Sequence, residues 1–76
     1  MHNKFKRHDK VIILTSPIED DIEPYSDPPL EIKPGMRGEI NVILPNGQYH
    51  IEVFDENGQT IAYVVLDEES LKAEKS

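Results

Sequence analysis

The chain has 76 residues, enough for one small domain, and its lack of cysteine excludes disulfide bonds, thiolate chemistry and cysteine-ligated zinc. The formal net charge is −7, with four basic and one acidic side chain in residues 1–10 against four basic and fourteen acidic in the remainder. An acidic body repels phosphate backbones and attracts basic proteins, so nucleic acid is disfavoured as the main ligand.

The start of the chain is polar and lacks the apolar stretch of a signal peptide. The longest apolar runs, residues 11–14 and 61–66, are too short to span a bilayer. We therefore expect a cytoplasmic protein without membrane contact. Residues 1–9 are predicted to form a flexible basic leader, 10–72 the folded domain and 73–76 a frayed tail.

Short β-type segments alternate with turn residues along the chain. Residues 10–15 (KVIILT) predict a first strand, because they are mostly β-branched and apolar. Residues 16–34 hold five of the six prolines and are rich in carboxylates, which predicts a long loop without regular strand pairing. Loops of this length in small domains are usually functional or mobile.

A three-stranded meander follows the loop. Residues 37–44 (RGEINVIL) and 48–54 (QYHIEVF) alternate apolar and polar side chains, as half-buried strands do. The Asn-Gly dipeptide between them predicts a type I′ hairpin turn, in which both residues have positive φ. A second turn, residues 55–58 (DENG), leads into residues 59–66 (QTIAYVVL), a strand that is apolar on both faces.

The end of the chain completes the predicted fold. Residues 67–71 favour one helical or 3₁₀ turn, followed by a short last strand. This order predicts an all-β domain, a five-stranded SH3-like barrel with a long Pro-rich first loop, and an open twisted sheet is the alternative. The predicted core is made of alternate strand residues: Val11, Ile13, Ile40, Val42, Tyr49, Ile51, Val53, Val64, Leu66 and Leu71.

Residues suited to catalysis or metal binding do not form a recognisable motif. His2 and His8 fall in the leader, and His50 is predicted to point outward into solvent. The acidic loop lacks the glycine and closing glutamate of a calcium loop, and no serine sits in a nucleophile elbow. We therefore predict a binding protein rather than an enzyme, with no cofactor and no metal.

The last strand of the meander predicts the binding surface. Only one of its apolar faces can serve the core, so its other face, together with outward residues of the neighbouring strands, forms an apolar patch. Either the proline-rich loop covers this patch or a protein partner does, and the sequence leaves both open. The predicted partner site comprises Phe54, Ile61, Tyr63 and Val65, with an acidic rim of Glu19, Asp20, Asp21, Glu23 and Asp27.

The segments KVIILT, IKPGMRGEINVI, YHIEVF and DENGQT, with a closing Leu66 and Leu71, resemble a bacterial family of small SH3-like proteins, the domain of unknown function 4926. The resemblance covers about four-fifths of the chain and departs in the first loop and the leader. It implies an SH3-like fold without catalytic residues. It also implies gene neighbourhoods with toxins, and hence an antitoxin or immunity role.

Three classes of function remain open. The first is an acidic antitoxin or immunity-type module that binds a basic protein, such as a toxin encoded by a neighbouring gene. The second is an SH3-like adaptor or accessory subunit of a larger enzyme complex. The third is a nucleic-acid or translation-associated module that uses the basic leader, where Phe5 lies among Lys4, Lys6 and Arg7. We expect a monomer or a weak homodimer.

Overall fold

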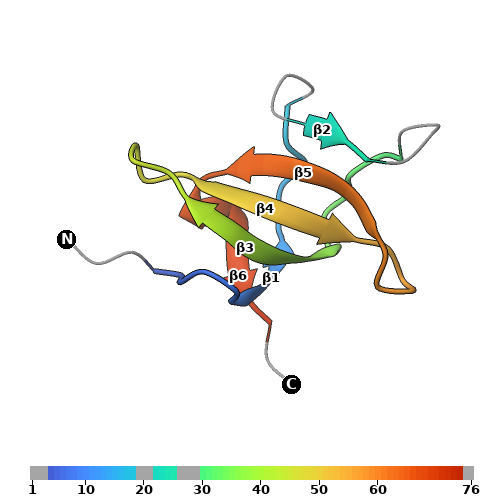
Figure 1. Ribbon diagram of the computed structural model, residues 1–76, viewed down its shortest axis with the longest axis horizontal. Coiled ribbons are helices and arrows are strands. Elements are labelled where there is room, and N and C mark those ends of the chain that lie inside the picture. The colour runs from blue at the N-terminus through green and yellow to red at the C-terminus, as the bar shows by residue number, and fades with distance from the viewer. Residues whose placement is uncertain (1–3, 19–21, 26–29, 75–76) are drawn as a thin grey trace.

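The computed structural model describes residues 4–18, 22–25 and 30–74, whose regular structure consists of six strands and one 3₁₀ turn. All six strands belong to one antiparallel sheet with the order β2-β5-β4-β3-β1-β6 (Figure 1). No helix in this part of the chain has the length and apolar character needed to cross a membrane. The elements are β1 (Lys10–Ile13), β2 (Ile22–Pro24), β3 (Arg37–Ile43), β4 (Tyr49–Phe54), β5 (Thr60–Leu66), η2 (Glu68–Ser70) and β6 (Leu71–Ala73).

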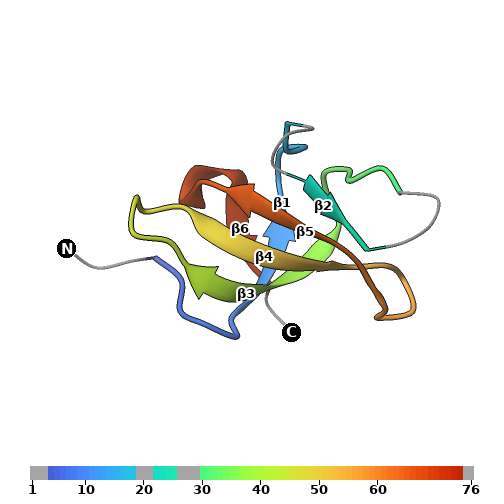
Figure 2. The ribbon, with the colours of Figure 1, turned by 45° about the horizontal axis from the view of Figure 1, so that its top comes forward.

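The sheet bends back over its own inner face. β3, β4 and β5 form the long meander, and β1 and β6 lie behind it and run across it (Figures 1 and 2). Gly38 on β3 pairs with Val11 of β1 on one side and Val53 of β4 on the other. A Cβ atom at Gly38 would lie 2.7 Å from Ile51 Cγ2 and 2.8 Å from the Glu52 carbonyl oxygen. The close approach of β3 to β4 therefore requires glycine at this position.

The all-β class is confirmed, with six strands in place of the five predicted. The additional strand is β2, inside the loop for which the prolines predicted no pairing. The Tyr25 N–H donates to the Ile61 carbonyl oxygen at 2.9 Å, so the nitrogen of the preceding Pro24 faces away from β5. Proline is tolerated there because β2 is an edge strand. In the described residues the sheet is open, with β2 and β6 as its edges.

Nine of the ten predicted core residues are buried, and Val42 is the exception at 42% exposed. Ile40 pairs with Ile51 but Val42 pairs with His50, so Asn41 is an extra residue that forms a β-bulge. The bulge reverses the alternation, which turns Val42 outward and Ile43 toward the core. The buried core consists of Phe5, Val11, Ile13, Ile32, Ile40, Tyr49, Ile51, Val53, Ile61, Ala62, Val64, Leu66 and Leu71.

The described part of the predicted leader packs onto the sheet. Phe5 is 2% exposed, and its ring meets the Tyr49 ring edge to face with 5.5 Å between centroids. The His8 N–H donates to the Ile40 carbonyl oxygen at 2.8 Å, and the Ile40 N–H donates to the backbone carbonyl oxygen of Asp9 at 3.0 Å. The predicted domain start at residue 10 is therefore too late, because Phe5 belongs to the core. Residues 1–3 of the leader and 75–76 of the tail lie outside the described residues.

The two hairpins have three-residue loops in place of the predicted type I′ turn. The Gly47 N–H donates to the Leu44 carbonyl oxygen at 3.0 Å, and the Leu44 N–H donates to Gln48 at 2.8 Å. Gly47 has φ +88°, whereas Asn46 has no positive φ. Pro45 explains the difference, since in the predicted two-residue turn it would have to donate a backbone N–H to Gln48, which proline lacks, and Leu44 pairs with Gln48 instead.

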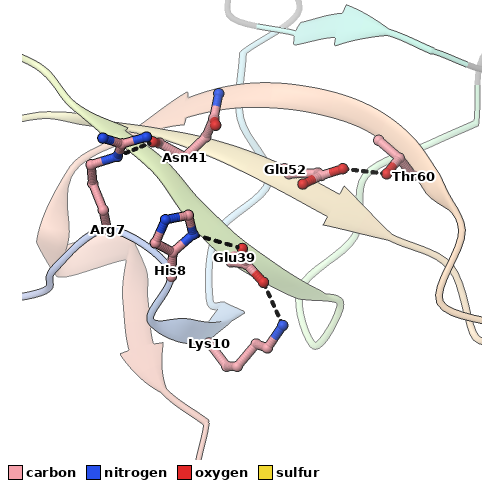
Figure 3. Close-up of polar contacts among 7 residues, drawn as sticks. All are labelled: Arg7, His8, Lys10, Glu39, Asn41, Glu52 and Thr60. Atoms are coloured by element: carbon pink, nitrogen blue, oxygen red, sulfur yellow. Dashed lines mark hydrogen bonds and ion pairs between the residues drawn. The ribbon is translucent and has the colours of Figure 1, made fainter.

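One carboxylate ties β1 and the N-terminal segment to β3. Glu39 accepts hydrogen bonds from Lys10 and, at 3.3 Å, from Nδ1 of His8 (Figure 3). These bonds lower the pKa of Glu39, the one from Lys10 most, and the bond to Glu39 raises the pKa of Lys10. Arg7 Nε adds a hydrogen bond to the Asn41 carbonyl oxygen at 3.2 Å.

Replacing Phe5→Ala tests the packing of the N-terminal segment. Loss of a fully buried phenylalanine should lower the free energy of unfolding by about 3 kcal/mol or more, measured by urea denaturation. The neighbouring exposed Lys6→Ala provides the control, and it should change stability by less than about 0.5 kcal/mol. Equal stability of the two variants would contradict the core position of Phe5.

Replacing Glu39→Gln tests the contribution of its ion pairs. Because the folded pKa of Glu39 is lowered, the carboxylate stabilises the fold above its ordinary pKa of 4.5, and this contribution disappears as the pH falls through the lowered value. Wild type should therefore exceed Glu39→Gln in unfolding free energy at pH 7, by less than about 1 kcal/mol because the pair is partly exposed. The difference should shrink as the pH falls below 4.5 and vanish once Glu39 is protonated in the folded state, and a pH-independent difference would refute this assignment.

Candidate functional site

The four apolar residues of the predicted partner site do not share one surface. Tyr63 and Val65 are half-buried on the outer face of β5, and Phe54 is half-buried at the end of β4. Ile61 was predicted to point outward and is buried, with 3% exposure. Val53 pairs with Ala62 and Phe54 with Thr60, so Ile61 is the extra residue of a second bulge that turns its side chain inward.

Of the predicted acidic rim, the structure places Glu23. It is exposed on β2 and lies directly opposite Tyr63 in the β2–β5 ladder. The other rim residues, Glu19, Asp20, Asp21 and Asp27, lie outside the described residues.

The described part of the proline-rich loop adds a strand to the sheet and contributes buried Ile32 to the core, and it leaves Tyr63 partly exposed. β2 lies beside β5 as an edge strand (Figure 2), and half-buried Ile22 packs against the core. From this part of the loop, Tyr25 reaches Tyr63 through its ring and is itself 68% exposed. Tyr63 therefore stays half-exposed at the surface.

Three aromatic rings form a row across the outer face of β4, β5 and the end of β2. His50 stacks on Tyr63, with 5.2 Å between ring centroids and an interplanar angle of 16°. Tyr25 meets Tyr63 at 6.0 Å and 86°, nearly perpendicular. We call His50, Tyr63 and Tyr25 the aromatic row. Of these three residues, only Tyr63 was predicted to belong to the site, although the predicted outward position of His50 placed it on the same face.

The position of His50 depends on the bulge in β3. His50 Nδ1 lies 3.0 Å from the side-chain nitrogen of Asn41, the extra residue of that bulge. His50 was predicted to be a solvated surface residue, and it is half-buried between this amide and the Tyr63 ring. Both contacts fix the imidazole plane, so one end of the aromatic row is rigidly supported.

Two carboxylates flank Tyr63 across the strands. Glu52 of β4 and Glu23 of β2 are its direct cross-strand neighbours, which places their Cβ atoms about 5 Å from that of Tyr63. Negative charge raises the pKa of the Tyr63 hydroxyl, with Glu52 as the largest cause, followed by partial burial, Tyr25 and Glu23. Glu52 also accepts the hydroxyl hydrogen of Thr60 (Figure 3). A partner at this face therefore meets aromatic surface within a negative potential.

Basic and acidic side chains lie on different parts of this outer face. The basic side chains of Arg7, His8 and Lys10 lie beside β3 (Figure 3). Glu39 accepts hydrogen bonds from His8 and Lys10, and the Asn41 carbonyl oxygen accepts one from Arg7. In the described residues the ion pairs join Lys10 and His8 to Glu39 and Arg37 to Glu74, so Glu52 and Glu23 have no cationic partner there. The carboxylates of Glu23 and Glu52 beside the aromatic row are therefore among those that form no salt bridge in the described residues.

Phe54 and Ile61 line a separate groove at the end of the sheet. The groove has a volume of ≈ 860 Å³ and runs between the loop before β3 and the β4–β5 turn. Its charged lining is mixed, with Lys33 and Arg37 opposite Asp55 and Glu56. Across the described residues, no three histidine, aspartate or glutamate side chains are grouped closely enough to hold a metal ion.

The face around Tyr63 is therefore the candidate functional site. It consists of the aromatic row with the carboxylates of Glu23 and Glu52. No protein-family model, no curated protein and no solved structure matches the chain, so its membership of the small bacterial family named above stays a prediction.

Proposed function

We propose that this chain is a non-catalytic protein-binding module, an acidic antitoxin or immunity-type protein that binds a basic protein partner through the face around Tyr63. The observation that carries the proposal is the pairing of half-exposed and exposed aromatic rings with the carboxylates of Glu23 and Glu52, which lack cationic partners in the described residues. Aromatic side chains at the centre of an interface often supply most of its binding energy. The net charge of −7 would speed association with a basic protein.

We further propose that the bent sheet is an SH3-like barrel, as in the bacterial family that the sequence resembles. The order of one strand, a long loop, a meander, a 3₁₀ turn and a short last strand supports this proposal. So does the crossing of β1 and β6 behind the meander (Figure 1). In this fold β2 is an added strand inside the first loop. A cytoplasmic monomer or weak homodimer is part of the same proposal, and the cysteine-free sequence is compatible with it.

The other two classes of function have less support. The basic residues Arg7, His8 and Lys10 are engaged with Asn41 and Glu39, and Phe5 is buried, so the N-terminal segment offers little stacking surface for a nucleic acid. An accessory subunit of an enzyme complex would also use a binding face, but no feature of the described residues favours that class over the first.

Replacing Tyr63→Ala tests the face directly. The variant should bind the protein encoded by the neighbouring gene about 2 kcal/mol more weakly, because a central interface tyrosine is lost. Calorimetric titration measures the affinity, and a thermal melt checks the fold. Leu14→Ala removes an exposed apolar side chain elsewhere and should leave affinity unchanged. Undiminished binding by folded Tyr63→Ala would contradict the proposed site.

Neutralising Glu23→Gln and Glu52→Gln together tests the electrostatic part of the proposal. Association with the same partner should slow, and its dependence on salt should weaken, because these carboxylates lie beside the interface. The matched control is Glu68→Gln with Glu69→Gln, which changes the net charge equally at the exposed 3₁₀ turn. Stopped-flow kinetics at several salt concentrations compares the two pairs. Identical behaviour would mean that net charge alone steers the partner.

A further inference from the structure

Tyr25 and Tyr63 form a corner whose aromatic rings and neighbouring carboxylates favour one kind of ligand. We propose that this corner binds the guanidinium group of an arginine side chain on the basic partner, held between the tyrosine rings and the carboxylates of Glu23 and Glu52. This inference rests on the proposed function, which it deepens by naming the chemical group that the face recognises.

The two rings supply the walls of the corner. Their planes are nearly perpendicular at 86°, with 6.0 Å between the centroids. Tyr25 is 68% exposed, so most of its ring surface is accessible to a ligand. Its backbone N–H donates to the Ile61 carbonyl oxygen at 2.9 Å, which fixes the residue at the end of β2. A cation within about 6 Å of a ring centroid is attracted by the negative face of the ring.

Two carboxylates lie at the same corner. Tyr25 directly follows β2 and continues its pairing with β5 through the N–H bond to Ile61, so its side chain leaves the same face as that of Glu23, two residues earlier. Glu52 approaches Tyr63 from the opposite strand. The raised pKa of Tyr63 reflects the negative potential of these groups. The ion pairs of the described residues join Lys10 and His8 to Glu39 and Arg37 to Glu74, and none of them involves Glu23 or Glu52.

The combination favours arginine over lysine. A guanidinium is planar and weakly hydrated, so it can lie on a ring face while its N–H groups point toward carboxylates. An ammonium group is compact and more strongly hydrated, and it gains less from a flat aromatic surface. The imidazole of His50 already covers one face of the Tyr63 ring, so the guanidinium would lie against the exposed Tyr25 ring and the remaining surface of Tyr63.

Capped tripeptides provide a test that is independent of any natural partner. We would titrate the ¹⁵N-labelled full chain at low salt with Gly-Arg-Gly, Gly-Lys-Gly and Gly-citrulline-Gly, and follow amide shifts by NMR. The arginine peptide should give saturable shifts centred on Tyr25, Tyr63 and Glu23. The citrulline peptide has nearly the same shape without the charge, and it should give none. The lysine peptide should bind several-fold more weakly.

Variants locate the peptide within the face. Tyr25→Ala should weaken the arginine peptide about fivefold and keep the spectrum of a folded protein, because Tyr25 is largely exposed. Glu52→Gln should also weaken it, whereas Glu68→Gln, with the same charge change at the 3₁₀ turn, should not.

The possible outcomes separate this inference from the proposed function. Equal shifts from the citrulline peptide, equal affinity for lysine, or unchanged binding by Tyr25→Ala would overturn the arginine site. Partner binding that Tyr63→Ala abolishes but Tyr25→Ala and the arginine peptide leave untouched would overturn it while the proposed function stands. Specific arginine binding without any complex with the neighbouring gene product would support the site and refute the antitoxin role.

Discussion

The close approach of β3 and β4 at Gly38 is the constraint on which the rest of the structure depends. Gly38 pairs with strands on both sides, at the place where the sheet passes from the meander to β1. No side chain fits there, because the nearest Ile51 and Glu52 atoms already lie within 3 Å of a Cβ position. β1 and β6 cross behind the meander, and the apolar side chains between the two layers are buried (Figure 1). The same bend leaves the opposite face of β4 and β5 at the surface, where the aromatic row lies.

Simple alternation predicted most of the core but not the two places where alternation fails. The patterns of β1, β4 and β5 were regular enough to place residues such as Ile13, Ile51 and Val64 correctly. Asn41 and Ile61 are bulge residues that shift the phase of the alternation, and the shift is hidden in the sequence because adjacent residues are both apolar, as in Val42-Ile43 and Ile61-Ala62. Phe5 was missed for a different reason. A lone aromatic among basic residues is typical of an unpacked segment, and its burial depends on a distant partner, Tyr49.

The residues on the outer face were predicted in part, for the same physical reason. The two-sided apolar character of β5 correctly placed Tyr63 and Val65 on the face away from the core, because only one face of a strand can serve the core. The contact between Tyr25 and Tyr63 could not be predicted, because the position of Tyr25 depends on the pairing of β2 within a proline-rich loop. The charge asymmetry between the basic start and the acidic remainder of the sequence is also reduced in the folded structure. The basic N-terminal segment lies on the sheet and pairs with Glu39, whereas Glu23 and Glu52 beside Tyr63 form no salt bridge in the described residues.

The orientation of Pro24 has a consequence for how this protein meets other chains. An exposed edge strand normally offers unpaired N–H groups to a further strand, and such pairing leads to domain swapping or fibres. At the outer edge of β2 the outward backbone positions are Ile22 and Pro24, and the proline has no hydrogen to donate, so one of the two donors is missing. Main-chain addition at this edge is thereby discouraged, although the edge borders the aromatic row. A partner that binds this region therefore depends more on side-chain contacts than on backbone pairing. Side-chain contacts distinguish one partner from another, whereas backbone pairing is possible with almost any extended segment.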